Sequence, residues 1–257
     1  MQAPITSRRT AGPAVWDRLW RQRPPDVKDA ALIAREGRSP RWRMIVAKLE
    51  AWFGTLDGLR TIELGSGRGD LSALLAQRGA RVTLLDTSDR ALAQARHRFD
   101  RMSLKAEFVQ ADMLGGLDPA SEPFDVALSS GVIEHFTNQN RTRAVRAHYD
   151  MLRRGGAAII SVPHAWCIPY RLWKSYLELR GCWPYGLEIP YSRRELARRS
   201  RQAGFEEVEL RCMGFWQSVG DHWGKSVLGL KVDWVDRPCV LDGGMGLVLL
   251  FCGRRLS

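Results

Sequence analysis

The chain has 257 residues, a length that suits one α/β domain with added segments and leaves little room for a second full domain. Its 45% hydrophobic and 26% charged residues exclude a largely disordered chain, and no apolar run approaches the roughly 20 residues of a membrane-spanning helix. The net charge of +11 favours an anionic partner such as RNA, acidic lipid or a phosphorylated substrate.

Two helical patterns come first along the chain, at residues 15–20 and 41–53, separated by proline and glycine breakers. They predict a helical preface over residues 1–58. From residue 59 onward, short apolar runs alternate with helical ones, which is typical of βαβ units and a parallel sheet. The expected strands are 60–64, 81–86, 106–110, 124–129 and 157–162, and the expected helices between them are 70–78, 89–99 and 141–152.

The alternation stops after residue 162, and a segment rich in Trp, Tyr and Pro occupies residues 164–191. A helix over 192–203 follows, because Ser192-Arg193-Arg194-Glu195 is a capping-box pattern and Gly204 suits the helix end. A strand over 205–212, a second irregular segment over 214–244 and a last strand over 246–252 complete the predicted domain, 59–257.

A glycine-rich loop stands where the first predicted strand turns into a helix, and it reads Glu63-Leu64-Gly65-Ser66-Gly67-Arg68-Gly69-Asp70. Glycines let the backbone pass close to a ligand and adopt positive φ. The nicotinamide fingerprint places its third glycine three residues after the second, where this chain has Asp70. The loop also lacks the Gly-Lys-Ser/Thr of a nucleoside-triphosphate loop.

Acidic residues follow the next two predicted strands. Asp86 ends the second strand about 20 residues after the loop, a position from which a carboxylate can accept hydrogen bonds from both ribose hydroxyls. Asp112 and Met113 follow the third strand, where the acid could accept from an adenine amino group while Met113 packs on the ring. Each residue alone could be a cap or a turn, but acids at the ends of successive strands favour a ligand site.

With these residues the chain resembles the class I S-adenosylmethionine-dependent methyltransferases, in particular the small-molecule group of the ubiquinone-biosynthesis type. Residues 63–69 are similar to that family's first motif, Asp86 to its ribose acid and Asp112 to its adenine acid. Residues 129–136 resemble its segment after strand four, and 152–156 its turn before strand five.

The resemblance implies an α/β, Rossmann-like fold whose seven-stranded, mostly parallel sheet has an antiparallel last strand and helices on both faces. It also implies S-adenosyl-L-methionine as the methyl donor. The donor-binding residues expected from it are Glu63, Gly65, Ser66, Gly67, Gly69, Asp86, Asp112, Met113 and Ser130. For Glu63, a purely structural role is the alternative.

Methyl transfer is an in-line displacement, so the enzyme mainly has to align nucleophile and methyl carbon and exclude water. A base is needed only if the nucleophile must lose a proton. The candidates are Glu134, His135 and His164, and His135 is preferred because its ordinary pKa lies near neutrality. The alternative is that His135 packs against or caps the following helix. Some relatives bind a divalent metal near this Glu-His pair, but without further clear ligands we expect no metal here.

Aromatic residues concentrate in the flanks: all ten tryptophans lie outside residues 61–163, and four of the five tyrosines fall within 164–191. In this fold these flanks usually cover the active site, so we expect the preface to cover the donor site and 164–191 and 214–244 to be lid insertions. The expected acceptor contacts are Trp166, Tyr170, Trp173, Trp183 and Tyr191. The alternative is that these aromatics form a satellite core.

The predicted function is therefore methyl transfer to a small-molecule or lipid-linked acceptor, apolar or aromatic in character. Apolar residues at helical spacing over 168–177, beside Arg171, Lys174 and Arg180, could also rest on an anionic membrane. The absence of a signal-like N-terminus, together with five scattered cysteines, predicts a cytoplasmic protein, with peripheral contact at the inner membrane surface as an option.

Two alternatives remain open. Charge alone favours an RNA methyltransferase, although residues 129–132 read Ser-Ser-Gly-Val instead of the Asn/Asp-Pro-Pro-Tyr typical of enzymes that methylate base amino groups. Five arginines over 193–201 suit either a solvated helix face or an anion site. The other alternative is a catalytically silent donor-binding partner protein. The sequence leaves the oligomeric state open.

Overall fold

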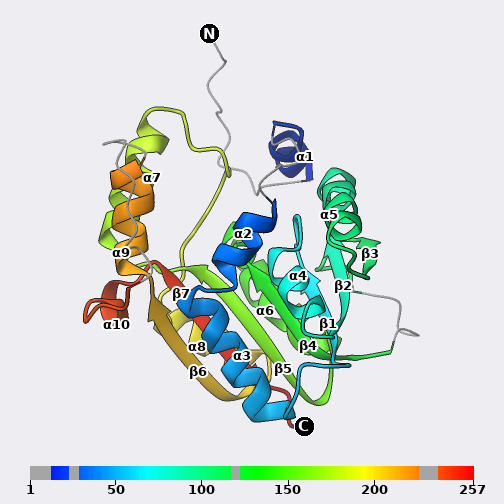
Figure 1. The fold of residues 1–257 in the computed structure, drawn as a ribbon. Helices are drawn as coiled ribbons and strands as arrows, with labels where there is room; N and C mark the ends of the chain where they lie inside the picture. The colour runs from blue at the N-terminus through cyan, green and yellow to red at the C-terminus, as the bar shows by residue number, and fades with distance from the viewer. Residues whose placement is uncertain (1–12, 23–28, 117–121, 226–236) are drawn as a thin grey trace.

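Seven strands form one sheet in the order β3-β2-β1-β4-β5-β7-β6 (Figure 1). The structure is a computed structural model that describes residues 13–22, 29–116, 122–225 and 237–257. The strands are β1 (Arg60–Leu64), β2 (Arg81–Asp86), β3 (Glu107–Gln110), β4 (Phe124–Ser130), β5 (Leu152–Pro163), β6 (Glu206–Met213) and β7 (Val248–Arg254). Among the described strands, β7 alone runs opposite to the others and pairs antiparallel with β5 and β6. This confirms the predicted mostly parallel sheet with an antiparallel last strand.

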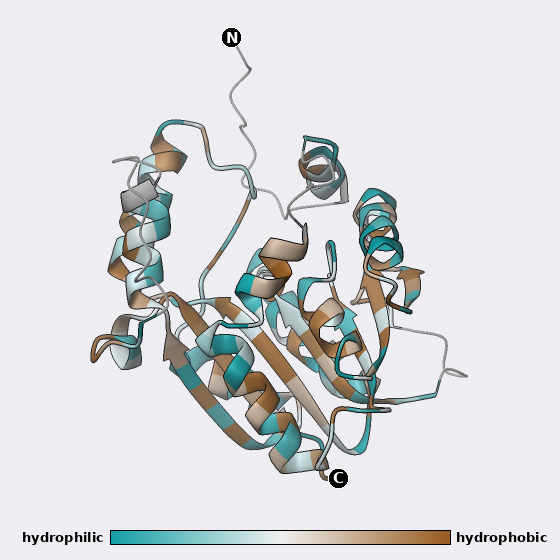
Figure 2. Ribbon diagram, in the orientation of Figure 1, coloured by the Kyte–Doolittle hydropathy of each residue, from teal (hydrophilic) through white to brown (hydrophobic). Residues whose placement is uncertain are grey.

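Helices cover both faces of the sheet, as predicted. Val82 and Leu84 of β2 pack with α2 (Asp29–Glu36), α3 (Pro40–Phe53), α4 (Asp70–Ala76) and α5 (Asp89–Arg101) on one face. Ile62 and Leu64 of β1 pack with α6 (Asn140–Met151) and α8 (Arg193–Gln202) on the other. Because both faces are buried, the inner strands are nearly continuous apolar runs, and Figure 2 colours them mostly brown.

The strand register brings the glycine loop and the acidic residues to one edge. β1 pairs with β2 from Arg60 opposite Arg81 to Leu64 opposite Leu85, and β2 pairs with β3 as far as Asp86 opposite Gln110. The loops that follow β1, β2, β3 and β4 therefore leave the sheet side by side. The carboxyl edge of a parallel sheet is where ligands bind in this architecture.

Most predicted elements are present with small shifts at their ends. Four of the five strands predicted between 60 and 162 agree within one residue at each end, but β5 begins at Leu152 instead of residue 157. The glycine pair at 155–156 favours a turn in the sequence. In the structure, however, Leu152 already pairs with Phe124 of β4, and the strand register shifts between Phe124 and Val126. The sequence also missed α2, whose eight residues contribute the buried side chain of Ile33 to the core.

The two insertions pack against each other. The first contains α7 (Ile168–Leu179), and the second contains α9 (Phe215–Gln217), the π-helical turn η2 (Ser218–Lys225) and α10 (Asp242–Met245). Trp223 Nε1 of η2 donates a hydrogen bond to the carbonyl oxygen of Pro169, at 3.0 Å. In Figure 1, α7 and α9 stand together at the end of the sheet where β7 and β6 lie. Among the described residues, no helix is long and apolar enough to cross a membrane.

Candidate functional site

The glycine loop joins β1 to α4 with a backbone that other residues would not tolerate. Gly65 and Gly67 have φ values of 65° and 54°, in the left-handed region. A Cβ on Gly67 would lie 2.8 Å from the ring of Trp20, and one on Gly65 would lie 2.7 Å from a methyl group of Val132. The glycines are therefore needed for both conformation and close packing.

Two buried carboxyl groups hold this loop. Glu63 Oε2 accepts hydrogen bonds from the backbone N–H of Ser72, at 3.1 Å, and from its hydroxyl. Asp86 Oδ2 accepts from the N–H of Gly67 at 2.8 Å, and Oδ1 accepts from the N–H of Ser88 at 2.9 Å. Burial raises the pKa of Glu63 to about 7 and also raises the pKa of Asp86.

A cavity of about 570 Å³ opens at this edge of the sheet. Six of the predicted donor residues line it: Gly65, Gly67, Asp86, Asp112, Met113 and Ser130. The other three lie behind the lining, because Glu63 supports the loop from below, Ser66 is buried, and a Cβ on Gly69 would meet Leu84.

The N-terminal helix α1 (Pro13–Gln22) forms another wall of the cavity through Trp16, Leu19 and Trp20. It is attached to the domain by two polar contacts. The hydroxyl of Ser88 donates to Asp17, and Gln94 Nε2 donates to the carbonyl oxygen of Trp20 at 2.9 Å. Figure 1 shows α1 above α4 and α5.

Glu134 and His135 also line the cavity, from the short helix η1 (Ile133–His135). His135 Nδ1 lies 2.7 Å from the carbonyl oxygen of Leu187, a contact that assigns the ring proton to Nδ1 and leaves Nε2 as the acceptor. Burial lowers the pKa of His135 to about 4, so the imidazole is neutral at pH 7. His164, the third predicted candidate, is buried and is not among the described residues that line the cavity. Its backbone N–H donates to the carbonyl oxygen of Leu247, and its backbone forms a β-bridge with Tyr191.

Glu188 is a site residue that the sequence reasoning missed. One potential ligand atom from each of Glu134, His135 and Glu188 lies within 4.8 Å of the others, an arrangement that could hold a divalent cation. Glu188 also accepts a hydrogen bond from the hydroxyl of Tyr170. No spacing rule connects Glu188 with the Glu-His pair, because it arrives from the far end of the first insertion.

Arg41 of α3 is a second residue that the sequence did not single out. Its Nη1 donates to Ser130 Oγ at 2.7 Å and to Ser161 Oγ at 3.2 Å, and its guanidinium forms an ion pair with Glu36. A cation is thereby held at the ends of β4 and β5, against a serine of the predicted donor set.

The five aromatic residues predicted to contact the acceptor are not among the described residues that line the cavity. Tyr170, Trp173 and Trp183 pack on one another, with ring centroids 6.4 Å apart for Tyr170 and Trp183 and 5.8 Å for Trp173 and Trp183. Trp166 is 67% exposed, and Tyr191 is fully buried. From this insertion, Tyr185 and Glu188 reach the cavity instead.

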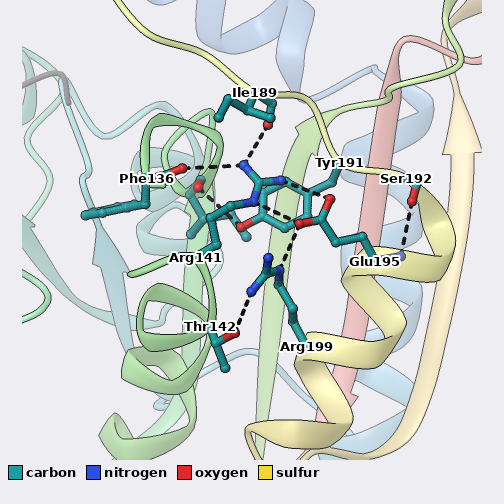
Figure 3. Close-up of polar contacts among 9 residues, drawn as sticks. Phe136, Arg141, Thr142, Ile189, Tyr191, Ser192, Glu195 and Arg199 are labelled. Carbon is teal, nitrogen blue, oxygen red and sulfur yellow. Dashed lines mark hydrogen bonds and ion pairs between the residues drawn. The ribbon is translucent and has the colours of Figure 1, made fainter. Parts of the chain in front are cut away.

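Arg141 of α6 holds the end of the insertion in place (Figure 3). Its guanidinium forms two hydrogen bonds with Glu195, donates to the carbonyl oxygen of Ile189 at 2.9 Å and lies 3.6 Å from the ring centre of Tyr191. Glu195 completes only half of the predicted capping box, because Ser192 Oγ accepts from its N–H while its own carboxylate binds Arg141 and Arg199.

Known proteins resemble this chain in both sequence and fold. Residues 62–156 match the family described as "Methyltransferase domain". A ubiquinone biosynthesis O-methyltransferase of Azoarcus sp. (strain BH72) is 32% identical over 174 residues, which make up 62% of this chain and 70% of that protein.

Two solved structures share the fold at low identity. Magnesium protoporphyrin IX methyltransferase from Synechocystis PCC 6803, with bound SAM, superposes with a TM-score of 0.56 at 17% identity, covering 94% of this chain and 90% of that one. The 1,6-didemethyltoxoflavin-N1-methyltransferase of Burkholderia thailandensis, with 1,6-didemethyltoxoflavin and S-adenosylhomocysteine bound, gives 0.57 at 19% identity, covering 99% and 95%.

Proposed function

Because the chain belongs to the class I S-adenosylmethionine-dependent methyltransferases, with S-adenosylmethionine as donor and a small molecule as acceptor, we propose that both react in the 570 Å³ cavity. The observation that carries this proposal is that one cavity is lined both by the glycine loop with Asp86 and by the Glu134-His135 pair. A donor site and a set of acid-base groups thus share one enclosed space.

The residues present fit the donor. Gly65 and Gly67 leave the backbone bare at the cavity wall, Asp86 offers carboxylate lone pairs to a ribose, and Asp112 with Met113 offers an acceptor and an apolar surface to an adenine. When bound, the donor supplies an electrophilic methyl group. Arg41 holds Ser130 in place at the cavity wall.

His135 is the proposed base. Its imidazole is neutral at pH 7, its Nδ1 is occupied by Leu187, and its Nε2 can take a proton from an acceptor hydroxyl or amine as the nucleophile attacks. Trp16 packs edge-on against the ring with centroids 4.7 Å apart, which restricts its motion and keeps water away. Helix α1 and Tyr185 are the proposed cover of the donor and acceptor ends.

A small acceptor is favoured over RNA by the arginines of α8. Arg199 is tied to Glu195 and Thr142, and Arg193 donates to the carbonyl oxygens of Leu210 and Gly243. Both guanidinium groups are thus engaged within the protein, which weakens the case for a basic groove.

Incubation of the protein with methyl-labelled donor and a cell extract, followed by fractionation, tests the proposed function. Label is expected in the small-molecule or lipid fraction, and Asp86→Ala should reduce it. Label confined to RNA would replace the proposal by an RNA methyltransferase. Absence of label in every fraction, with donor binding intact, would point to a catalytically silent partner protein.

A lipid-linked acceptor is favoured by the outer face of α7. Ile168, Leu172, Tyr176 and Leu179 are all exposed there, Leu179 at 88%, with Arg171 and Arg180 beside them. An exposed apolar stripe flanked by arginines suits the surface of an anionic bilayer. The relatives named as ubiquinone biosynthesis enzymes are consistent with such an acceptor.

Co-sedimentation with vesicles of phosphatidylglycerol and phosphatidylcholine tests this membrane contact. We expect Leu172→Asp with Leu179→Asp to release the protein, and the wild-type protein to bind less as salt increases. Leu32→Asp, at an exposed leucine of α2, is the matched control. Equal sedimentation of all three proteins would rule out docking through α7.

A further inference from the structure

The acceptor side of the cavity holds two buried carboxyl groups in close proximity. Glu134 is 1% exposed and Glu188 is 8% exposed, and both line the cavity together with His135. Glu134 Oε2 has no hydrogen-bond partner among the described residues. Burial and the nearby Glu188 raise the pKa of Glu134 well above its ordinary value, so this carboxyl group favours its protonated form in the empty cavity. A cation in the cavity would supply the contact that the ionised form lacks.

No described lysine or arginine forms an ion pair with either carboxylate. The nearest cations are committed elsewhere, because Arg141 binds Glu195 and Lys174 pairs with Glu178 while its Nζ lies 5.0 Å from the ring centre of Trp183. His135 adds no positive charge, since burial holds its pKa at about 4. Arg141 and Lys174 act on Glu134 and Glu188 only at a distance, and burial still raises the pKa of both carboxyl groups. Neither carboxyl group therefore has a direct counter-ion, and a bound cation would favour their ionised forms.

Aromatic rings form the neighbouring walls. Trp16, Trp20, Phe136 and Tyr185 line the same cavity. Faces of such rings attract cations, most strongly when water is excluded. Carboxyl groups and aromatic rings in one cavity disfavour an anionic ligand. They bind an ammonium group more strongly than a neutral alkyl group, because both attract positive charge.

The acidic pair is held in place by main-chain contacts. The N–H of Ile189 donates to the carbonyl oxygen of Glu134 at 2.8 Å, and the carbonyl oxygen of Leu187 contacts His135. Arg141 fixes Ile189 from the other side (Figure 3). Glu188 stands between two anchored residues, so it opposes Glu134 without needing a ligand to draw it in.

We propose that the acceptor carries a positively charged nitrogen, and that this ammonium group binds between Glu134 and Glu188 against the aromatic wall of the cavity. The inference rests on the proposed function and adds the chemical class of the acceptor. It gives a role to the carboxyl group that the insertion delivers to the cavity.

The test uses the full chain, treated with chelator and saturated with S-adenosylhomocysteine, and two probes of similar shape: the phenethylammonium ion and neutral 2-phenylethanol. Calorimetry is expected to show that the cation binds at least about tenfold more tightly, a difference of about 1.4 kcal/mol. Glu188→Gln and Glu134→Gln should each remove most of that preference. Glu206→Gln, which changes an exposed carboxylate of β6 that does not line the cavity, should leave it unchanged.

The outcomes separate this inference from the proposed function. Equal affinity for the two probes in a protein that binds S-adenosylhomocysteine would overturn the ammonium site and leave the methyltransferase function standing. Failure to bind S-adenosylhomocysteine would instead contradict the proposed function. Tight binding of Mn²⁺ alone that is lost in Glu188→Gln, with no preference for the amine, would assign the site to a metal and also overturn the inference. Glutamine can still accept the Tyr170 hydrogen bond, and Tyr170→Phe provides a second variant if Glu188→Gln fails to fold.

Discussion

Asp86 illustrates how one side chain can serve both the loop and the ligand. Its two oxygens already accept hydrogen bonds from the N–H groups of Gly67 and Ser88, so the carboxylate is oriented before the donor binds. A carboxylate has about four lone-pair positions, which leaves room for the ribose hydroxyls. Because the backbone already orients the Asp86 carboxylate, less side-chain conformational entropy is lost when the donor binds.

Asp86→Ala should weaken donor binding by about 1 to 3 kcal/mol, because both the ribose contact and the support of Gly67 disappear. Calorimetry with S-adenosylhomocysteine measures the change. The exposed Asp89 of α5, changed to Asn, is the control and should bind normally. Unchanged affinity in Asp86→Ala would remove Asp86 from the donor site.

His135→Ala should lower kcat by about 10²- to 10⁴-fold while donor affinity stays within a factor of about two. Since burial holds the pKa of His135 at about 4, the wild-type kcat should show no titration of this residue near pH 6.5 and should fall only in more acidic solution. His97→Ala, at an exposed histidine of α5, is the matched control. A parallel loss of donor binding in His135→Ala would indicate a structural role instead.

At the scale of elements, the first insertion divides into two parts. Tyr170 and Trp173 of α7 form a small satellite core with Cys167 and Trp183. Tyr185 packs on this core and also lines the cavity, as does Glu188. The aromatic content of 164–191 therefore serves packing in one part and the site in the other. Contacts of His135 and Arg141 with Leu187 and Ile189 join the second part to the sheet.

Tyr185→Ala should raise the acceptor KM because Tyr185 lines the cavity, and it should also reduce stability because its ring packs on Trp183 with centroids 5.2 Å apart. Trp173→Ala should leave the acceptor KM nearly unchanged and reduce stability by about 1 to 3 kcal/mol, since Trp173 packs on Trp183 and is only partly buried. Steady-state kinetics with thermal unfolding of both variants distinguishes the two. If Trp173→Ala alters acceptor KM as strongly as Tyr185→Ala, the satellite core takes part in acceptor binding.

At the scale of the whole molecule, buried ionisable groups make stability depend on pH in opposing directions. The pKa of Glu63 is about 7 in the folded chain and near 4.5 when exposed, so the folded state holds an extra proton between these values. Stability from Glu63 is therefore full below pH 4.5 and falls as pH rises towards 7. His135 and His148, with pKa values lowered from 6.5 to about 4, act oppositely, because stability rises between pH 4 and 6.5.

Comparison of the wild-type protein with Glu63→Gln isolates the first effect. Glutamine can still accept the hydrogen bonds from Ser72 but does not titrate. As pH rises from 4.5 to 7, the unfolding free energy of the wild type should therefore fall by about 3 kcal/mol relative to that of Glu63→Gln. Chemical denaturation at several pH values measures this shift. Glu50→Gln, on the exposed face of α3, is the matched control variant. A flat difference for Glu63→Gln would mean that Glu63 is ionised throughout.

Local patterns were sufficient for much of the fold. Strand and helix periodicity located β1, β2 and β4 within one residue, and the contiguous run from Glu63 to Asp70 identified the loop that the structure places at the cavity. These features depend on neighbours in the chain, because side-chain alternation, capping and positive φ are decided within a few residues. The antiparallel β7 and the donor came from the family resemblance, which is also carried by this contiguous region.

Only the tertiary structure brought Glu188 to Glu134, Arg41 to Ser130, and Trp16 and Trp20 over the glycine loop. These pairs are separated by tens of residues, and their meeting depends on how the insertion, α3 and α1 pack on the sheet. The same packing left Trp166 outside the cavity and buried Tyr191 beneath Arg141. Aromatic composition predicts that side chains will be buried. It does not say whether they pack against a neighbouring helix or against a ligand, because the same residue types suit both. The choice between them is made by long-range contacts that no short window of sequence contains.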